Sequence, residues 1–256
     1  MNHFYTAFHT DVGKKKKTNQ DSLLLQGITD GSSETLLAVL CDGMGGISKG
    51  ELASATVVRY FAEWFQLKYT ERGSGWKDEE IEEQWKQLLN DANQKLLQYG
   101  AKEQMELGTT ATAVMITSEG RYLICHVGDT RVYRMGQGME QLTEDHTYIA
   151  REIKRGNMTP KQALTDTRRN VLLQCIGVDE YLEPQILFGE FNRNEELLIC
   201  SDGFRHCVTE REIKKCLQSG ISPSEETIKK KLKELVDLNM DRGETDNISA
   251  ICIKLK

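Results

Sequence analysis

Aspartates stand at the ends of several strongly apolar segments of this chain. Asp42 directly follows LLAVLC, Asp202 follows ELLICS, Asp129 follows YLICHVG, and Asp246 stands just before NISAICIKL. An ionised carboxylate beside a buried strand is costly unless it is paired or bound to a metal. The ends of packed strands can meet at one sheet edge, where only a multivalent cation offsets several carboxylates well. Carboxylate ligands without pairs of His or Cys suit Mg²⁺ or Mn²⁺ better than zinc.

A plain turn is the alternative for any one of these aspartates, because Asp-Gly after a strand is ordinarily a turn. Asp30-Gly31, between two expected strands, illustrates it. The run DGMGG at 42–46 is neither of two common phosphate-binding loops, because Ser48 interrupts a dinucleotide fingerprint and Glu51 follows Gly50 where a P-loop needs Lys. A flexible turn that offers a carbonyl beside an acid is what remains.

Composition narrows the class of protein. The chain has 256 residues, a formal charge of −6 and no apolar run near the ~20 residues of a membrane span. The acidic balance argues against nucleic acid as a partner, and the N-terminus lacks the pattern of a signal peptide. Seven scattered cysteines without a C-x-x-C pair predict a reduced, cytoplasmic protein with neither disulfides nor structural zinc. Three prolines and no internal repeat favour a single domain over 1–256.

Hydrophobic periodicity predicts clusters of strands separated by pairs of helices. Strands are expected at 22–25, 35–41, 110–117, 122–127, 131–135, 186–191, 196–200 and 248–255. Helices are expected at 52–65, 81–99, 148–155, 210–218 and 225–238. Strict alternation of strand and helix is missing, so a parallel doubly wound sheet is disfavoured. The pattern indicates an α+β fold with antiparallel sheets covered by helices.

Seven motifs in this order resemble those of the metal-dependent protein phosphatase 2C family, in its compact bacterial form. They are TNQD at 18–21, DGMGG at 42–46 with Gly50, GTTA at 108–111, VGDTR at 127–131, LTEDH at 142–146, SDG at 201–203 and DN at 246–247. Each motif is weak alone, but their order over nearly the whole chain is specific. The resemblance implies two antiparallel sheets packed face to face, with helices outside and a metal pair in a cleft at one sheet edge.

The resemblance also implies a role for each acid. Asp42 would bridge two Mn²⁺ or Mg²⁺ ions, Asp21 and the carbonyl of Gly43 would serve one ion, and Asp202 and Asp246 the other. Asp129, with Asp202, matches the family's site for a third, weaker ion. The segment 147–169 corresponds to a variable flap beside the cleft.

The implied reaction is hydrolysis of phosphoserine and phosphothreonine esters in proteins. A hydroxide held by the metals, and so by Asp42 and Asp202, would attack phosphorus without a covalent phosphoenzyme. The expected partners are phosphoprotein substrates and a cognate Ser/Thr kinase, and we expect a monomer that binds neither nucleic acid nor membrane.

Two positions depart from the family pattern. Lys16 stands where an Arg usually binds substrate phosphate, and Lys lacks the planar fork that grips two oxygens, so Lys17 is an alternative. Met44 replaces a His proposed as general acid in many eukaryotic members. His146 belongs to a motif usually regarded as structural, and His126 lies in an apolar strand and is expected in the core. The other histidines, at 3, 9 and 206, belong to no pattern that indicates a function.

Two other functions are weighed against this one. Cys125 to Arg131 matches C-x-x-G-x-x-R, the loop of cysteine-dependent phosphatases, but Asp129 would repel phosphate and the following VYRM predicts a strand where that loop needs a helix. A catalytically silent phosphatase-like binding module is the second alternative. Degenerate modules usually lose metal acids, whereas all of them are present here.

Overall fold

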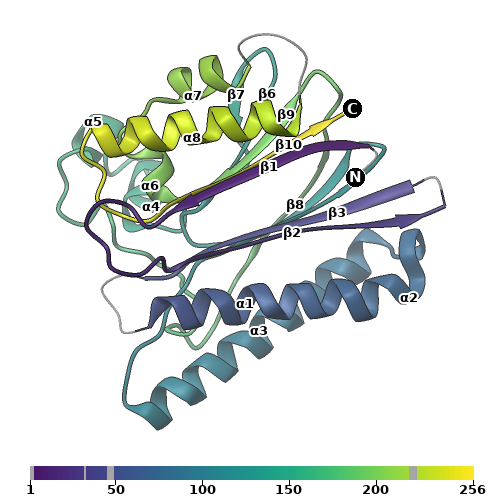
Figure 1. Cartoon of the computed structure of the whole chain (residues 1–256). Helices are drawn as coiled ribbons and strands as arrows, with labels where there is room; N and C mark the ends of the chain where they lie inside the picture. The colour runs from purple at the N-terminus through teal and green to yellow at the C-terminus, as the bar shows by residue number, and fades with distance from the viewer. Residues whose placement is uncertain (1–2, 32, 45–48, 219–223) are drawn as a thin grey trace.

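Two antiparallel sheets packed face to face form the centre of the protein. The computed structural model describes residues 3–31, 33–44, 49–218 and 224–256, and within these ranges each sheet has five strands (Figure 1). The first sheet has the order β1-β10-β9-β6-β7 and the second the order β2-β3-β4-β5-β8. The expected α+β fold with two antiparallel sheets and helices outside is confirmed.

The bounds of the elements are as follows. The first sheet contains β1 (Phe4–Asp11), β10 (Ile248–Leu255), β9 (Glu196–Cys200), β6 (Arg131–Met135) and β7 (Met139–Gln141). The second contains β2 (Asp21–Asp30), β3 (Ser33–Asp42), β4 (Ala111–Thr117), β5 (Arg121–Val127) and β8 (Gln185–Glu190). The helices are α1 (Gly50–Glu63), α2 (Thr70–Arg72), α3 (Asp78–Glu103), α4 (Tyr148–Lys154), α5 (Pro160–Ala163), α6 (Asp202–Arg205), α7 (Glu210–Leu217) and α8 (Glu225–Asp241), with a π-helical turn η1 (Trp64–Tyr69) and a 3₁₀ turn η2 (Gly73–Gly75).

Each sheet is covered on its outer face by helices. Helices α1 and α3 lie against the second sheet, which begins with β2, and α7 and α8 lie against the first sheet, which begins with β1 (Figure 1). The helix starts follow from capping: the side-chain oxygens of Thr147, Thr209 and Ser224 accept hydrogen bonds from the first turns of α4, α7 and α8. Within the described residues, no helix is long and apolar enough to cross a membrane.

Strand β3 shows how the layers are built. Leu36, Ala38 and Leu40 face the other sheet, whereas Leu37, Val39 and Cys41 face the helices. Both sides of the strand are buried, so its sequence is continuously apolar and does not alternate with polar residues. The same alternation carries Asp42, the last residue of β3, to the inter-sheet side. The candidate site therefore lies where the apolar layer between the sheets ends.

Several elements differ from the sequence-based expectation. Strands β1 and β7 were not predicted, and β2 extends to Asp30 although only 22–25 was expected. Strand β1 is an edge strand in which Phe4, Thr6 and Ala7 are buried but every residue from Phe8 to Asp11 is partly or fully exposed, so FYTAFHTD carries no clear burial pattern. The turn at Asp30-Gly31 is confirmed, with Gly31 at a φ of 61°.

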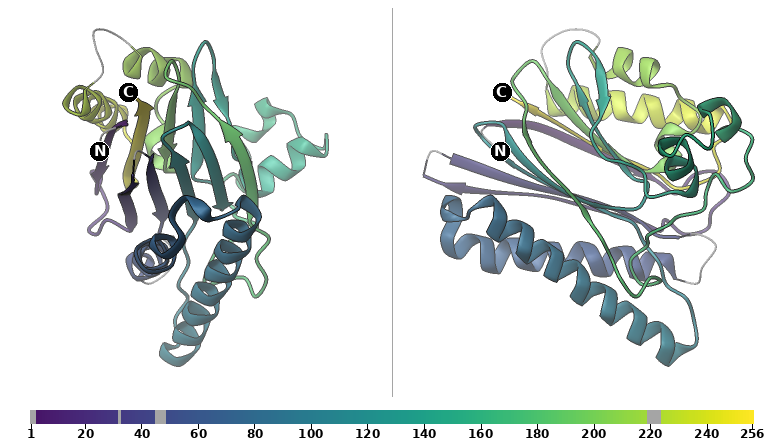
Figure 2. Two further views of the ribbon diagram at one scale, coloured as in Figure 1. Left: turned by 90° about the vertical axis from the view of Figure 1, so that its right-hand side faces the viewer. Right: turned by 180° about the vertical axis from the view of Figure 1, so that it is seen from behind.

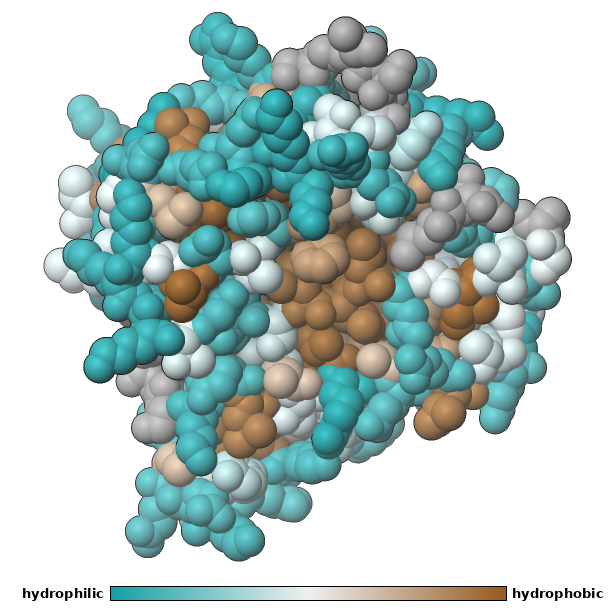
Figure 3. All heavy atoms as spheres, in the orientation of Figure 1, coloured by the Kyte–Doolittle hydropathy of each residue, from teal (hydrophilic) through white to brown (hydrophobic). Residues whose placement is uncertain are grey.

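Two surface features frame the sandwich. Helices α4 and α5, in the segment predicted as a flap, project from its side (Figure 2). On the face shown in Figure 3, apolar residues gather between the edge strands β1 and β2. Phe8 of β1 is 49% exposed, and the alternation along the strand places it on the same side as Phe4, which is buried between the sheets.

The aromatic cluster between α1 and α3 should carry a large share of the stability. Phe61 is fully buried and packs edge-to-face on Trp85 at 5.3 Å between ring centroids. We expect Phe61→Ala to lower the free energy of unfolding by about 3–5 kcal/mol, because the lost contacts leave a cavity. Tyr181→Ala, at an 85% exposed aromatic, should change it by less than about 0.5 kcal/mol. Urea titrations would contradict this if both variants lost similar stability.

Candidate metal centre

Asp21 and Asp42 lie directly opposite each other on the neighbouring strands β2 and β3. Directly opposed residues of an antiparallel pair share a face of the sheet, so both side chains point toward the other sheet. Asp21 is 8% exposed, and neither of its carboxylate oxygens has a hydrogen-bond partner among the described residues. Burial, together with the charges of Asp202 and Asp246, raises the pKa of Asp21 to about 7. This carboxyl is therefore costly to ionise in the protein alone.

Asp42 is the electrostatic centre of the group. Burial raises its pKa well above the ordinary value, and the charge of Asp21 adds to the effect. Asp202, Asp129 and Asp246 act on Asp42 in the same direction. The fold thus brings the predicted acids into one electrostatic environment, in which the other four aspartates make ionisation of Asp42 less favourable.

The backbone around Asp42 is held from both sides by the motif GTTA. Thr110 donates its N–H to Asp42 O at 2.9 Å and accepts Asp42 N–H on its Oγ1 at 2.9 Å. Gly43 N–H donates to Gln20 O at 3.1 Å. A Cβ on Gly43 would lie 2.4 Å from the carbonyl oxygen of Gly50, so only glycine allows this approach. The predicted Gly45 and Gly46 lie outside the described residues.

Asn247 ties the C-terminal motif to the loop before β2. Its Oδ1 accepts Gln20 N–H at 2.9 Å, and its Nδ2 donates to Val12 O at 2.9 Å and to Thr18 O at 3.2 Å. A Cβ on Gly13, whose φ is +75°, would lie 2.3 Å from Asp246 O. These contacts bring the ends of the chain together and place Asp246 beside the loop that carries Lys16.

Lys16 contacts a predicted metal ligand. Its Nζ lies 2.8 Å from Asp246 Oδ1, with side-chain exposures of 28% and 40%. Sequence reasoning placed Lys16 near substrate phosphate and did not foresee this ion pair. Lys15 and Lys17 are exposed in the same loop.

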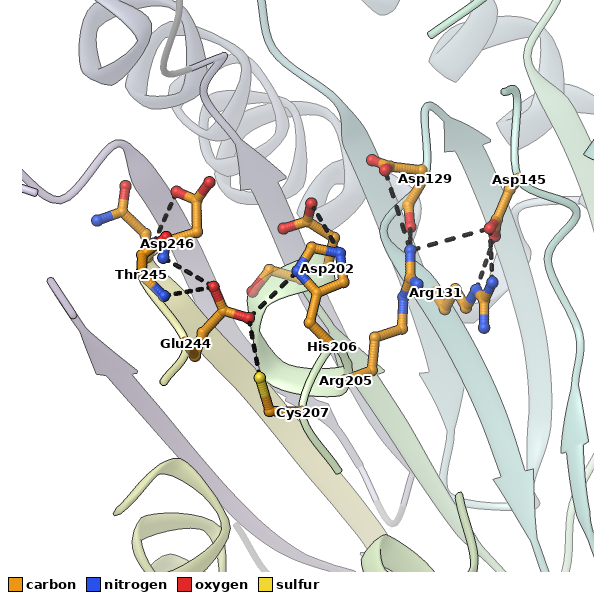
Figure 4. Close-up of polar contacts among 12 residues, drawn as sticks. Asp129, Arg131, Asp145, Asp202, Arg205, His206, Cys207, Glu244, Thr245 and Asp246 are labelled. Carbon is orange, nitrogen blue, oxygen red and sulfur yellow. Dashed lines mark hydrogen bonds and ion pairs between the residues drawn. The ribbon is translucent and has the colours of Figure 1, made fainter. Parts of the chain in front are cut away.

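Asp202 begins α6 and has a histidine beside it (Figure 4). His206 Nε2 lies 3.4 Å from Asp202 Oδ2, and His206 Nδ1 lies 3.2 Å from Glu244 Oε2. Glu244 is only 7% exposed. Although burial acts against its ionisation, hydrogen bonds from His206 and from the amides of Thr245 and Asp246 lower the pKa of Glu244 to about 2.

The expectation that His206 carries no signal therefore missed a residue at the site. The spacing alone could have found it, because His206 stands four residues after Asp202, one turn along a helix. Glu244, two residues before Asp246, was also missed, and here nothing in the local sequence marks it as a partner of His206.

Asp129 also borders a further group of charges, which contains Arg205, Arg131 and Asp145. Burial raises the pKa of Asp129 to about 7, and Asp202 adds to the shift. Arg205 donates from Nη2 to Asp129 O at 2.9 Å and lies 3.8 Å from Asp145 Oδ2 (Figure 4). Arg131 forms a two-pronged pair with Asp145, at 2.8 Å from Nε and 2.7 Å from Nη2. The predicted structural role of Arg131 agrees with this pairing.

The cysteine-dependent alternative does not fit the structure. Cys125 is 1% exposed within β5, and burial raises the pKa of its thiol to about 12. Arg131 is on β6, where Asp145 binds its guanidinium. The sequence Cys125–Arg131 therefore forms no phosphate-binding loop.

The remaining histidines of the motifs are structural. His146 accepts Gly128 N–H on Nδ1 at 3.3 Å, and its ring packs 5.0 Å from that of His126. His126 is fully buried, as predicted for a core residue.

The donor set fits a hard divalent cation. The acids supply only oxygen, and positive charge would stabilise the unpartnered oxygens of Asp21 and the ionised forms of Asp21 and Asp42, whose pKa values are raised by burial and by neighbouring acids. In the described part of the chain, no group of three or more His, Cys, Asp or Glu side chains is arranged so that it could hold a metal ion on its own. Mg²⁺ typically takes only one or two carboxylates and keeps several waters, so a complete cage is not required. Beside Asp129 and Asp246 lies a cleft of about 640 Å³, which Ile149 and Ile153 of α4 also line.

The sequence profile of the protein phosphatase 2C family matches residues 11–237. The chain belongs to the protein phosphatase 2C family. It is 28% identical to the serine/threonine phosphatase stp of Listeria innocua over 98% of this chain and 95% of that one. The crystal structure of the serine/threonine phosphatase Stp1 from Staphylococcus aureus superimposes with a TM-score of 0.86, at 27% identity, over 98% of this chain and 94% of the other. The protein is thus a metal-dependent protein serine/threonine phosphatase.

A more distant structure has the same fold. The catalytic domain of the phosphatase PstP, in complex with two manganese ions, covers 99% of the present chain and 98% of its own, with a TM-score of 0.78 at 24% identity. The phosphatase described here therefore shares its two-sheet architecture with this more distant structure.

His126 should make the stability of the phosphatase sensitive to acid. Burial, with a smaller effect of His146, lowers the pKa of His126 to about 3, whereas an unfolded His titrates near 6.5. Below pH ~6.5 the unfolded chain therefore takes up a proton that the folded chain does not, and stability falls. Without metal, His126→Gln should reduce this loss between pH ~6.5 and ~4.5 by up to about 1.4 kcal/mol per pH unit. Urea titrations at several pH values would check it, and equal slopes in both proteins would contradict it.

Proposed function

We propose that this phosphatase hydrolyses phosphoserine and phosphothreonine esters of proteins with two Mn²⁺ or Mg²⁺ ions held by the converging aspartates. Asp42 would contact both ions, Asp21 and the carbonyl of Gly43 one of them, and Asp202 and Asp246 the other. Asp129 would contribute to a third, weaker site. The observation that carries the proposal is the buried pair Asp21 and Asp42, whose pKa values are raised by burial and by the acids around them.

The residues of the chain would have separate roles in the reaction. When bound, the ions supply a water nucleophile at neutral pH and positive charge for the phosphoryl oxygens. Asp42 and Asp202 orient that nucleophile through their carboxylates. Thr110 and Gln20 fix the backbone on either side of Asp42, so that little reorganisation is needed during the reaction.

Lys16 is the proposed phosphate-binding residue, with Lys17 as the alternative. Because its ammonium pairs with Asp246 at 2.8 Å, it has to leave this carboxylate to reach a phosphate. Positive charge at Asp246 would favour that movement by repulsion. Met44 has no proton to donate, so another group has to protonate the leaving group. The Met44 side chain packs instead against Cys175, with 2.8 Å between Sδ and Sγ.

We further infer that the enzyme acts in the cytoplasm as a monomer, on proteins phosphorylated by Ser/Thr kinases, a cognate kinase among them. The cysteines support a reducing compartment, because seven scattered cysteines without a C-x-x-C pair are typical of a protein that needs no disulfide framework.

Removal of metal should abolish the reaction. We expect EDTA to abolish hydrolysis of a phosphothreonine peptide, and Asp42→Asn to reduce the Mn²⁺-dependent rate at least about 100-fold, because the central ligand is lost. In EDTA the same variant should be more stable than the wild type in urea titrations, since one of the repelling carboxylates is gone. Cys125→Ser should keep the wild-type rate.

Full activity in EDTA would exclude the metal mechanism. Inactivity of the wild type with every metal and phosphopeptide tried would favour the catalytically silent binding module.

Lys16→Gln should raise the KM for the phosphopeptide about tenfold, because one charge-assisted contact of about 1.5 kcal/mol is lost. It should also tighten Mn²⁺ binding, since the competing ammonium leaves Asp246. Steady-state kinetics and calorimetry would measure the two effects. Lys15→Gln removes the same charge from an exposed position of the loop and should change neither. An unchanged KM for Lys16→Gln would exclude Lys16 as the phosphate-binding residue and point to Lys17.

A further inference from the structure

Glu244 is a buried acid for which the proposed reaction has no use. Its Oε1 accepts the backbone N–H groups of Thr245 at 2.6 Å and of Asp246 at 2.9 Å. Its Oε2 lies 3.2 Å from His206 Nδ1 (Figure 4). The Glu244 carboxylate thus binds the backbone at Asp246 with one oxygen and contacts the ring of His206 with the other.

His206 continues the connection to the second predicted ligand of the same ion. Its other ring nitrogen lies 3.4 Å from Asp202 Oδ2, so the ring stands between the carboxylates of Asp202 and Glu244 (Figure 4). The path runs from Asp202 through His206 and Glu244 to the amide of Asp246. It joins two segments that lie far apart in the sequence.

The segments that carry this path are fixed to one another by α8. Asn239, fully buried near the end of that helix, donates from Nδ2 to Phe204 O at 2.8 Å and accepts Cys207 N–H on Oδ1 at 3.2 Å. Its backbone carbonyl accepts Glu244 N–H at 3.0 Å. Because Phe204 and Cys207, on either side of His206, and Glu244 itself are all anchored to Asn239, the side chains of His206 and Glu244 are held at a defined separation.

We infer that Glu244 and His206 are positioning residues that hold Asp202 and Asp246 in a fixed relation for the ion these two aspartates share. The inference rests on the proposed function, since it assigns the two residues a role toward that ion. Groups that orient metal ligands in this way typically affect metal affinity by about 10–100-fold.

A purely electrostatic effect predicts a different result for His206. A cation beside Asp202 disfavours binding of a divalent ion, so its removal would strengthen Mn²⁺ binding if charge alone mattered. If His206 orients Asp202, its removal weakens Mn²⁺ binding instead. The sign of the change therefore separates positioning from charge.

The test is calorimetric titration of the metal-stripped full-length protein with Mn²⁺. We expect His206→Ala and Glu244→Ala each to weaken the affected Mn²⁺ site by about 10–100-fold. His206→Gln, which keeps an N–H donor for Asp202, should recover most of the lost affinity. The double variant should lose about as much as one single variant, because both residues act along one path.

The matched control is Glu212→Gln. Glu212 pairs with Arg242 at 2.6 Å, immediately before the Glu244 segment, and within the described part of the chain its polar contacts are with Thr209 and Arg242, not with Asp202 or Asp246. Its loss should leave Mn²⁺ affinity unchanged. Circular dichroism of every variant would show that the fold is retained, and if Glu244→Ala fails to fold, the two His206 variants still decide the question.

Two results would overturn the inference: tighter Mn²⁺ binding by His206→Ala, or unchanged affinity in both His206 variants. Failure of the proposed function would look different, because the wild type itself would then bind no Mn²⁺.

Discussion

The repulsion between buried carboxylates is the constraint on which the rest of the site depends. Asp21 and Asp42 sit at the polar end of a layer that is otherwise filled by aliphatic side chains such as Leu40. Burial and neighbouring acids raise the pKa of both carboxyls, so the arrangement opposes its own ionisation. The backbone contacts of Thr110 and Asn247 hold the acids together against this repulsion.

Cations of the same chain stand beside several of these acids. Lys16 pairs with Asp246, His206 lies beside Asp202, and Arg205 contacts the backbone and carboxylate of Asp129. These basic side chains offset part of the acidic charge at the cleft. A phosphate that approaches the site meets basic side chains as well as carboxylates, and the distribution of charge matters more than the net value of −6.

Much of the fold could be predicted because its central strands are buried on both faces. Strands β3 and β10 are continuous apolar runs, and their positions are close to those expected from the sequence. Strand β1 was missed because it forms a sheet edge, and β7 because three residues carry too short a pattern. Hydrophobic periodicity reports burial, so elements that are only partly buried escape it.

The sequence by itself determined the family, through the order of its motifs, and it predicted which residues would carry the chemistry, namely oxygen ligands at the ends of apolar strands. Only the tertiary structure decided which of them meet. The pairing of β1 with β10 brings the loop of Lys16 to Asp246, and Asn239 brings His206 to Glu244. Such contacts join segments that are distant in the chain, and their strength depends on distances set by the packing of sheets and helices. Local sequence patterns reflect only periodicity and residue type, so they cannot predict those distances.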